Sequence, residues 1–307
     1  MSRPPDPSSV RVPGPWTHRE ISANGIRLHV AEVGSGPLVL LLHGFPEFWW
    51  SWRHQLPALA AAGMRAVAVD LRGYGDSDKP PRGYDLWTLS GDVAGLVRAL
   101  GERQADFVGH DWGGIVSWCT AVLHPRVVRS MTVLAAPHPL ALGQALLRDP
   151  AQRSAVRHLA GFQAPWVPER RLTRDGAVLV EQILRSGAGP RWPRSSEFSA
   201  VARRYREAML IPAAAHCALE YYRWLGRSQF RFDGRRLSRA VDRAARVPVL
   251  QVHGADDPYV LERTARGSAR WAGDCYRYAV LPGIGHFVQQ EAPEHTTALV
   301  TEFLRTV

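Results

Sequence analysis

Three places along the sequence put an acid or a base directly after a short apolar run: Asp111, the neighbouring pair Asp256 and Asp257, and His286. An aspartate can attack an electrophilic carbon and form an ester, and a histidine oriented by a second carboxylate can deprotonate water. If the runs are parallel strands, their carboxyl ends meet at one edge of a sheet, where ligands bind. The chain order nucleophile, acid and base therefore indicates a hydrolytic site.

The strongest local motif surrounds Asp111, in the stretch Gly-His-Asp-Trp-Gly-Gly at residues 109–114. An apolar run that enters Gly-x-Asp-x-Gly-Gly and continues as a helix predicts a sharp strand-turn-helix elbow with an exposed central side chain. Serine at such an elbow attacks acyl groups, whereas aspartate indicates attack on a saturated carbon, which leaves an ester on the enzyme. The alternative is that Asp111 only caps the helix that follows.

The rest of the chain supplies the elements that must position these residues. Apolar or alternating segments predict strands at 18–22, 27–32, 38–42, 65–69, 106–108, 128–134, 247–252 and 277–281. Helix-spaced segments alternate with the later strands, which predicts an α/β fold with a mostly parallel, doubly wound sheet. Residues 140–246 are patterned for helices only and predict an inserted all-helical cap, so the core domain comprises residues 17–139 and 247–307.

Composition excludes several classes of protein. With 307 residues and 46% hydrophobic content, the chain can bury a large core, and no run approaches the roughly 18 apolar residues of a membrane span. Residues 1–16 are rich in Pro and Ser and lack an apolar signal core, which predicts a flexible tail on a cytoplasmic protein. The isolated cysteines Cys119, Cys217 and Cys275 are expected to be reduced packing residues, and we expect no metal or cofactor.

The formal charge of +10 raises the question of nucleic-acid binding. Lys79 is the only lysine, however, and the arginines are spread along the chain without a recognisable binding module. We therefore expect neither a nucleic acid nor a membrane as a partner. The oligomeric state is left open, with a homodimer as one option.

Two motifs together give a resemblance to a known family. His-Gly-Phe-Pro at 43–46 matches an H-G-x-P element and residues 109–114 match an aspartate elbow, so the chain resembles the epoxide hydrolases of the α/β-hydrolase fold. The resemblance implies that Asp111 is the nucleophile and that the backbone N–H groups of Phe45 and Trp112 form an oxyanion hole. It also implies a cis bond before Pro46, which would aim the Phe45 N–H at the site.

The same resemblance extends to the acid and the base. Gly-Ala-Asp-Asp-Pro at 254–258 matches a G-x-x-D element, which makes Asp257 the triad acid and leaves Asp256 as the alternative. His286 matches a terminal G-H-F element and is implied to be the base. The implied reaction converts an epoxide, a small-molecule substrate, to a vicinal diol through an alkyl ester on Asp111.

The cap is where the chain departs from the family's usual pattern. These enzymes usually use two cap tyrosines to hydrogen-bond the epoxide oxygen, and the match for one is Tyr222, with Tyr221 as the alternative. At the place of the other, before an F-Q-x-P element at 162–165, the chain has His158. Either His158 donates a hydrogen bond or Tyr222 works alone. The aromatic residues expected to line the pocket are Trp49, Phe162 and Phe287.

Two other functions compete with this interpretation. A haloalkane dehalogenase shares the elbow and the aspartyl ester, but usually holds its halide with Trp N–H donors and often an Asn at the position of Phe45. Trp112 could supply one such donor. The fold also serves as a small-molecule-binding protein without catalysis, although the complete set of acid, base and nucleophile favours an enzyme.

Overall fold

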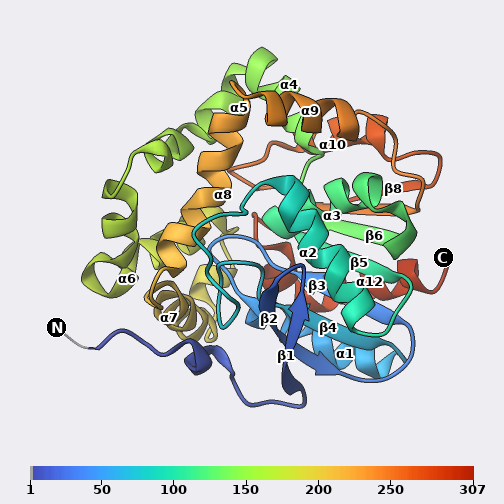
Figure 1. Cartoon of the computed structure of the whole chain (residues 1–307), viewed down its shortest axis with the longest axis horizontal. Coiled ribbons are helices and arrows are strands. Elements are labelled where there is room, and N and C mark those ends of the chain that lie inside the picture. Colours follow the sequence, from blue (N-terminus) through green and yellow to red (C-terminus); the bar gives the residue numbers. More distant parts are fainter. Residues whose placement is uncertain (1–2) are drawn as a thin grey trace.

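The computed structural model describes residues 3–307. Within that range eight strands form one sheet in the spatial order β1-β2-β4-β3-β5-β6-β7-β8 (Figure 1). The strands are β1 (Thr17–Ala23), β2 (Ile26–Val33), β3 (Leu38–Leu42), β4 (Arg65–Val69), β5 (Ala105–His110), β6 (Val128–Leu134), β7 (Val249–Gly254) and β8 (Tyr276–Leu281). The pairs β1–β2 and β2–β4 are antiparallel and all other pairs are parallel. The prediction of a mostly parallel, doubly wound sheet is confirmed.

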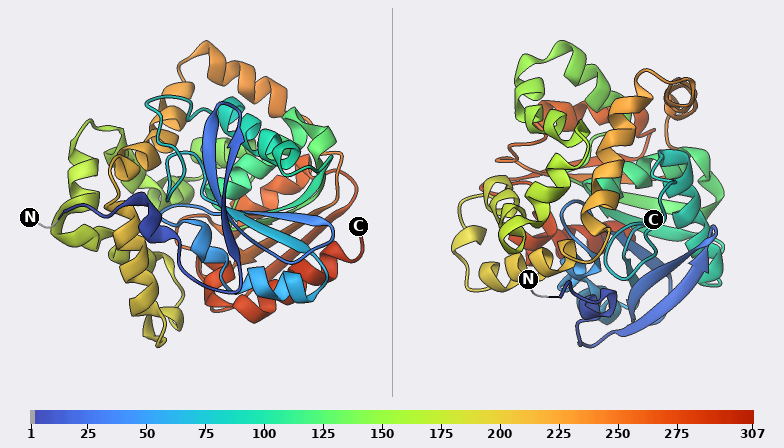
Figure 2. Two further views of the ribbon diagram at one scale, coloured as in Figure 1. Left: turned by 60° about the horizontal axis from the view of Figure 1, so that its bottom comes forward. Right: turned by 60° about the vertical axis from the view of Figure 1, so that its left-hand side comes forward.

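Helices cover both faces of the sheet, as Figure 2 shows in its left view. Those of the core are α1 (Gln55–Ala61), α2 (Leu86–Ala99), α3 (Trp112–Leu123), α10 (Glu262–Arg266), α11 (Val288–Glu291) and α12 (Pro293–Leu304). Helix α1 packs against α12, and α2 packs against α3 on the opposite face. Every residue of the central strands β3 and β5 is consequently buried, which explains the unbroken apolar character of β3; the polar residues of β5, Asp106 and His110, lie near its two ends.

The segment between β6 and β7 contains helices and, among the described residues, no strand. Its helices are α4 (Pro139–Arg148), α5 (Pro150–Ala155), α6 (Val167–Gly187), α7 (Phe198–Met209), α8 (Ala214–Ser228) and α9 (Phe232–Val241). Helices α6, α7 and α8 pack on one another and lie to the left of the sheet in Figure 1, whereas α9 packs on α3 of the core. None of the helices described between residues 3 and 307 is both long and apolar enough to span a bilayer.

The N-terminal segment differs from the flexible tail that its composition predicted. A short 3-10 turn, Pro7–Val10, packs on the core, and Val10 is only 3% exposed. The Val10 carbonyl accepts a hydrogen bond from the Trp49 indole at 2.9 Å, and the Trp16 ring lies edge-on to Trp49 with centroids 5.2 Å apart. The prediction of a loose tail was therefore wrong from residue 7 onwards, because the segment covers an otherwise open tryptophan.

This packing predicts a measurable contribution to stability. Val10→Ala removes two buried methyl groups and should lower the free energy of unfolding by about 1–2 kcal/mol, as measured by urea denaturation of the full chain. Val307→Ala, at a residue that is 41% exposed, serves as the control and should change it by less than about 0.5 kcal/mol. Equal stability of the two variants would mean that the N-terminal segment does not pack in solution.

Candidate active site

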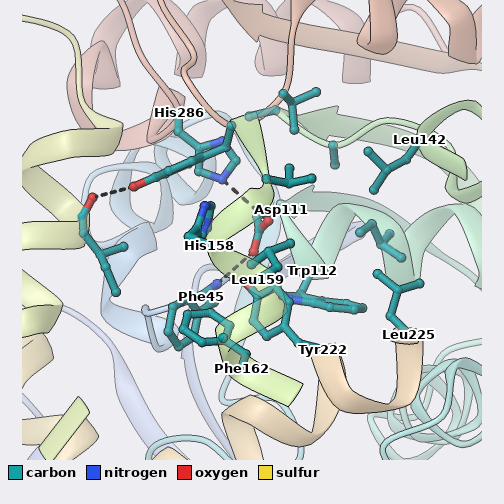
Figure 3. Close-up of a pocket in the computed structure, with 18 of the residues that line it drawn as sticks. Phe45, Asp111, Trp112, Leu142, His158, Leu159, Phe162, Tyr222, Leu225 and His286 are labelled. Atoms are coloured by element: carbon teal, nitrogen blue, oxygen red, sulfur yellow. Dashed lines mark hydrogen bonds and ion pairs between the residues drawn. The ribbon is translucent and has the colours of Figure 1, made fainter. Parts of the chain in front are cut away.

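The carboxyl ends of β5, β7 and β8 meet at one edge of the sheet and bring three predicted side chains into contact. Asp111 Oδ2 lies 3.5 Å from His286 Nε2 (Figure 3), and Asp257 Oδ2 lies 2.8 Å from His286 Nδ1. Asp257 is buried, whereas Asp256 is exposed, so it is Asp257 that contacts the imidazole. His286 thus bridges two carboxylates.

The backbone at Asp111 has the geometry of an elbow. Its φ of +48° lies in a region that non-glycine residues rarely adopt, at a cost on the order of 1–3 kcal/mol. A side chain at Gly113 would collide with the Leu42 carbonyl, so the turn packs directly on β3 only because glycine is there. Asp111 precedes α3 but makes no side-chain capping hydrogen bond. The alternative that Asp111 only caps this helix is therefore wrong.

One backbone N–H group contacts the Asp111 carboxylate, and a second follows it directly in the chain. The Phe45 N–H donates to Asp111 Oδ1 at 2.9 Å, and the Phe45–Pro46 peptide bond is cis, as the family resemblance implied. Trp112 is the first residue of α3, where a backbone N–H has no partner within the helix. Of the two predicted oxyanion donors, Phe45 therefore lies next to the carboxylate in space, and Trp112 is the neighbour of Asp111 in the chain.

The charges of the three contacting side chains stabilise one another. Burial opposes the charge on His286, but the charge of Asp257 and the hydrogen bond with Asp111 outweigh it and raise the pKa of His286 well above 6.5. Burial likewise opposes ionisation of Asp111 and Asp257. The hydrogen bond and the charge of His286 outweigh it, so both aspartates have a lowered pKa. The directions of these three pKa shifts favour an imidazolium between two carboxylates.

The second oxygen of Asp257 is held by the backbone. Oδ1 accepts the N–H groups of Tyr259 at 2.8 Å and Val260 at 3.0 Å. This fixes the carboxylate so that Oδ2 faces His286 Nδ1. When the imidazole is neutral, the remaining proton therefore stays on Nδ1 and leaves Nε2 as the basic nitrogen.

A second buried pair, which the sequence analysis missed, lies behind the site. Glu47 Oε2 is 2.7 Å from His110 Nδ1, and Gln289 and Gln290 donate to Glu47 Oε1. His110 Nε2 donates to the His286 carbonyl at 2.9 Å, since a carbonyl can only accept. Because the other ring nitrogen faces a carboxylate, His110 and Glu47 form a hydrogen-bonded pair that supports the backbone of His286. The only sequence signal was a carboxylate directly after the H-G-F-P element.

A cavity of about 450 Å³ opens over Asp111 between the sheet edge and the cap. Its walls include three of the predicted residues, Tyr222, His158 and Phe162, together with the ring of Phe45 (Figure 3). The ring of Tyr222 lies edge-on to Phe45 and Phe162, with centroids 5.5 and 5.2 Å away. Tyr221 is fully buried outside the cavity and donates to the Arg72 carbonyl at 2.8 Å. Tyr222 is consequently the cap tyrosine that faces the site.

Two of the aromatic residues expected in the pocket do not line it. Trp49 is fully buried beneath Trp16, with its N–H used by a backbone carbonyl. Phe287 is also fully buried and packs between His286 and Trp192, behind the base. Both predictions were wrong, because these two rings are packed on all sides by the core and leave no surface to the cavity.

Tyr259 lines the cavity but was not predicted. Its ring lies edge-on to His286 with centroids 5.2 Å apart, and its hydroxyl is 3.1 Å from the Ile183 carbonyl and 3.0 Å from Ser186 Oγ in α6. The side chain therefore connects the loop of Asp257 to the cap. Its position two residues after Asp257 was the only available signal.

Comparison with known proteins agrees with this fold and site. The sequence model of the alpha/beta hydrolase fold family matches residues 37–293, and the chain belongs to the α/β-hydrolase family. The AB hydrolase superfamily protein YfhM of Bacillus subtilis is 32% identical over 289 residues, which cover 93% of this chain and 96% of that protein.

Two relatives indicate to which group within the α/β-hydrolase family this chain belongs. Epoxide hydrolase A of Mycobacterium tuberculosis is 34% identical over 321 residues, which cover 95% of this chain and 98% of that protein. The crystal structure of epoxide hydrolase A from Mycobacterium thermoresistibile superposes with a TM-score of 0.79 at 29% identity, over 94% of this chain and 98% of that chain. Within the α/β-hydrolase family, this chain belongs to the epoxide hydrolases.

The coupling of charges predicts how His286 titrates. In the wild type its imidazole should lose a proton well above pH 6.5, and Asp257→Asn should lower that pKa by about one unit or more because it removes the nearest favourable charge. The measurement is a pH titration by NMR of ¹⁵N-histidine-labelled protein, with His286→Gln to identify the signal. Asp256→Asn is the matched control, and an equal shift in both variants would contradict the assignment of Asp257.

Proposed function

We propose that the protein hydrolyses an epoxide to a vicinal diol through a covalent ester on Asp111. The observation that carries the proposal is the partly buried Asp111 carboxylate, which faces a largely apolar cavity and contacts the His286 imidazole held by Asp257. Such a carboxylate is ionised and poorly solvated, and can open the strained ring of an epoxide. The epoxide hydrolases among its relatives support the same class of reaction.

In the first half-reaction the cap supplies hydrogen-bond donors to the epoxide oxygen. Burial and the charge of Asp111 raise the pKa of Tyr222 well above 10.0, so its phenol keeps its proton and can donate as the ring opens. Burial lowers the pKa of His158, so this imidazole is neutral, and its single N–H donates to the epoxide oxygen once it leaves the Ala155 backbone, with which the ring hydrogen-bonds in this structure. Residues 140–246 thus act as a lid that completes the site.

Protonated His286 supplies the proton that this step consumes. Attack converts the Asp111 carboxylate into a neutral ester and the epoxide oxygen into an alkoxide, which takes a proton from Tyr222. The proton that His286 releases restores the phenol. Because Asp111 has lost its charge, the pKa of His286 falls, and the imidazole becomes the neutral base that the next step requires.

In the second half-reaction water attacks the carboxyl carbon of Asp111. His286 Nε2 takes the proton of the water and Asp257 stabilises the imidazolium that forms. Negative charge develops on the former carbonyl oxygen, which the N–H groups of Phe45 and Trp112 stabilise; Phe45 N already lies 2.9 Å from Asp111 Oδ1. One such donor contributes on the order of 3 kcal/mol. Collapse of the oxyanion breaks the bond from the carboxyl carbon to the alkyl oxygen, which takes the remaining proton of the attacking water to complete the diol and leaves Asp111 as a carboxylate.

The wall of the cavity favours this reaction over dehalogenation. Trp112 is the only tryptophan in its lining among the described residues, and Phe45 presents an apolar ring. Incubation with styrene oxide and, separately, with 1-bromobutane tests the proposal by assays of diol and of bromide. We expect diol and no bromide. Bromide without diol would mean a dehalogenase, and neither product would favour a binding protein.

The covalent ester predicts the fate of labelled oxygen. In a single turnover in H₂¹⁸O, the label should enter the Asp111 carboxylate and be absent from the first diol, because water attacks the carboxyl carbon. Mass spectrometry of the peptide and of the diol measures both. His286→Gln should accumulate protein plus one substrate, and Asp111→Asn, the control, should stay unmodified. Label found directly in the first diol would mean that water attacks the epoxide itself.

The pair of cap donors predicts a non-additive double mutant. Tyr222→Phe and His158→Phe should each slow formation of the ester about tenfold or more, because each removes a donor to the same oxygen. The double variant should fall well short of the summed effects. Rapid-quench mass spectrometry measures the rate, with Tyr221→Phe as the control outside the cavity. If His158→Phe forms the ester at the wild-type rate, Tyr222 is the sole donor.

A further inference from the structure

Glu291 accepts hydrogen bonds from the backbone on both sides of His286 and from the cap. Its Oε1 accepts the Phe287 N–H at 3.0 Å, and its Oε2 accepts the Gly285 N–H at 2.9 Å and the Gly189 N–H at 2.7 Å. Glu291 is the last residue of α11, and its side chain folds back over the loop that carries His286. Gly189 lies just beyond the end of α6. One carboxylate therefore joins the loop of the base to the cap.

The backbone of His286 is itself held between the cap and the core. Its N–H donates to the Gly187 carbonyl at 2.8 Å, and its carbonyl accepts from His110 Nε2 at 2.9 Å. A side chain at Gly285 would collide with the Gly187 carbonyl, so the two backbones touch directly. The N–H groups of residues 285, 286 and 287 all have partners, and Glu291 provides two of the three.

A carboxylate is required for this arrangement. Burial raises the pKa of Glu291, and the three backbone donors, with the charge of His286, favour its ionised form. Two oxygens that only accept can serve three N–H groups, whereas an amide has one oxygen and turns its own NH₂ towards backbone donors. Glutamine at this position would therefore leave at least one buried N–H without an acceptor.

We propose that Glu291 is a positioning residue that holds the base His286 against the end of the cap helix α6. The inference rests on the proposed function, whose two half-reactions depend on His286 to different degrees: the first uses only its proton, whereas the second needs its Nε2 as the base. Ester formation needs Asp111, which the elbow and Phe45 hold without contact to Glu291. Ester hydrolysis needs His286 Nε2 at a fixed place beside the ester. A loosened His286 loop therefore slows the second half-reaction far more than the first.

The test compares Glu291→Gln with Glu294→Gln, a nearby exposed glutamate. Each protein is mixed with excess styrene oxide, quenched at intervals and analysed by intact-mass spectrometry, with diol measured in parallel. Hydrolysis in Glu291→Gln should slow by about tenfold to a hundredfold while ester formation stays within about threefold. Most of this variant should then carry the ester, whereas the wild type and Glu294→Gln should be mainly unmodified. Glu291→Asp, with a shorter carboxylate, should accumulate an intermediate amount.

Two results would overturn the role of Glu291. One is an equal fall in both half-reactions, which a smaller folded fraction would produce, and the other is no change in either. If Glu291→Gln does not fold, Glu291→Asp decides the matter by the same measurement. The His286→Gln variant separates this inference from the proposed function. If it accumulates ester and the Glu291 variants do not, only the role of Glu291 fails; if the wild type forms neither ester nor diol, the proposed reaction fails.

Discussion

An imidazolium held between a buried carboxylate, Asp257, and a partly buried one, Asp111, is the interaction on which the rest of the structure depends. Removing charges from water is costly, and a buried pair is stable only when hydrogen bonds satisfy its remaining lone pairs. Here one positive charge on His286 meets two negative charges, on Asp111 and Asp257. Backbone N–H groups compensate the excess: Phe45 donates to one carboxylate, and Tyr259 is one of the donors to the other. The loops after the strands must therefore place main-chain donors as accurately as side chains.

The residues that carry the chemistry were predictable because topology constrains them. Asp111, Asp257 and His286 each follow a strand of a parallel sheet, so alternation of strands and helices places them at one edge whatever the rest of the chain does. Sequence patterns do not distinguish Asp257 from its neighbour Asp256, because the two differ only in the direction in which the turn points their side chains. That choice followed from burial and from the 2.8 Å contact with His286.

The residues that were not predicted depend on contacts between distant parts of the chain. The N-terminal segment looked loose because its composition is polar, yet it is held by Trp49, more than thirty residues away in the sequence. Trp49 and Phe287 were predicted to line the pocket. In an irregular loop, however, the direction of a side chain follows no periodicity that the sequence would reveal. Glu47 and Glu291 are single carboxylates outside any acid-base pattern. Their importance comes from the backbone donors and the imidazole that the fold brings to them.

The cap packs more tightly on the core at the end of α6 than at the turn that carries His158. This difference in packing matches the two steps of the proposed reaction. The 3-10 turn Arg157–Gln163, which carries His158 and Phe162, contributes no buried residue. The end of α6 is instead fixed to the loop of His286 by a backbone hydrogen bond from the His286 N–H to the Gly187 carbonyl, and through Glu291, which accepts the Gly189 N–H. In the proposed reaction, substrates that differ in shape meet the cavity wall differently, whereas the same base hydrolyses every ester on Asp111. Rigid packing is therefore concentrated at the group whose task does not change with the substrate, and the looser packing lies at the residues that must accommodate it.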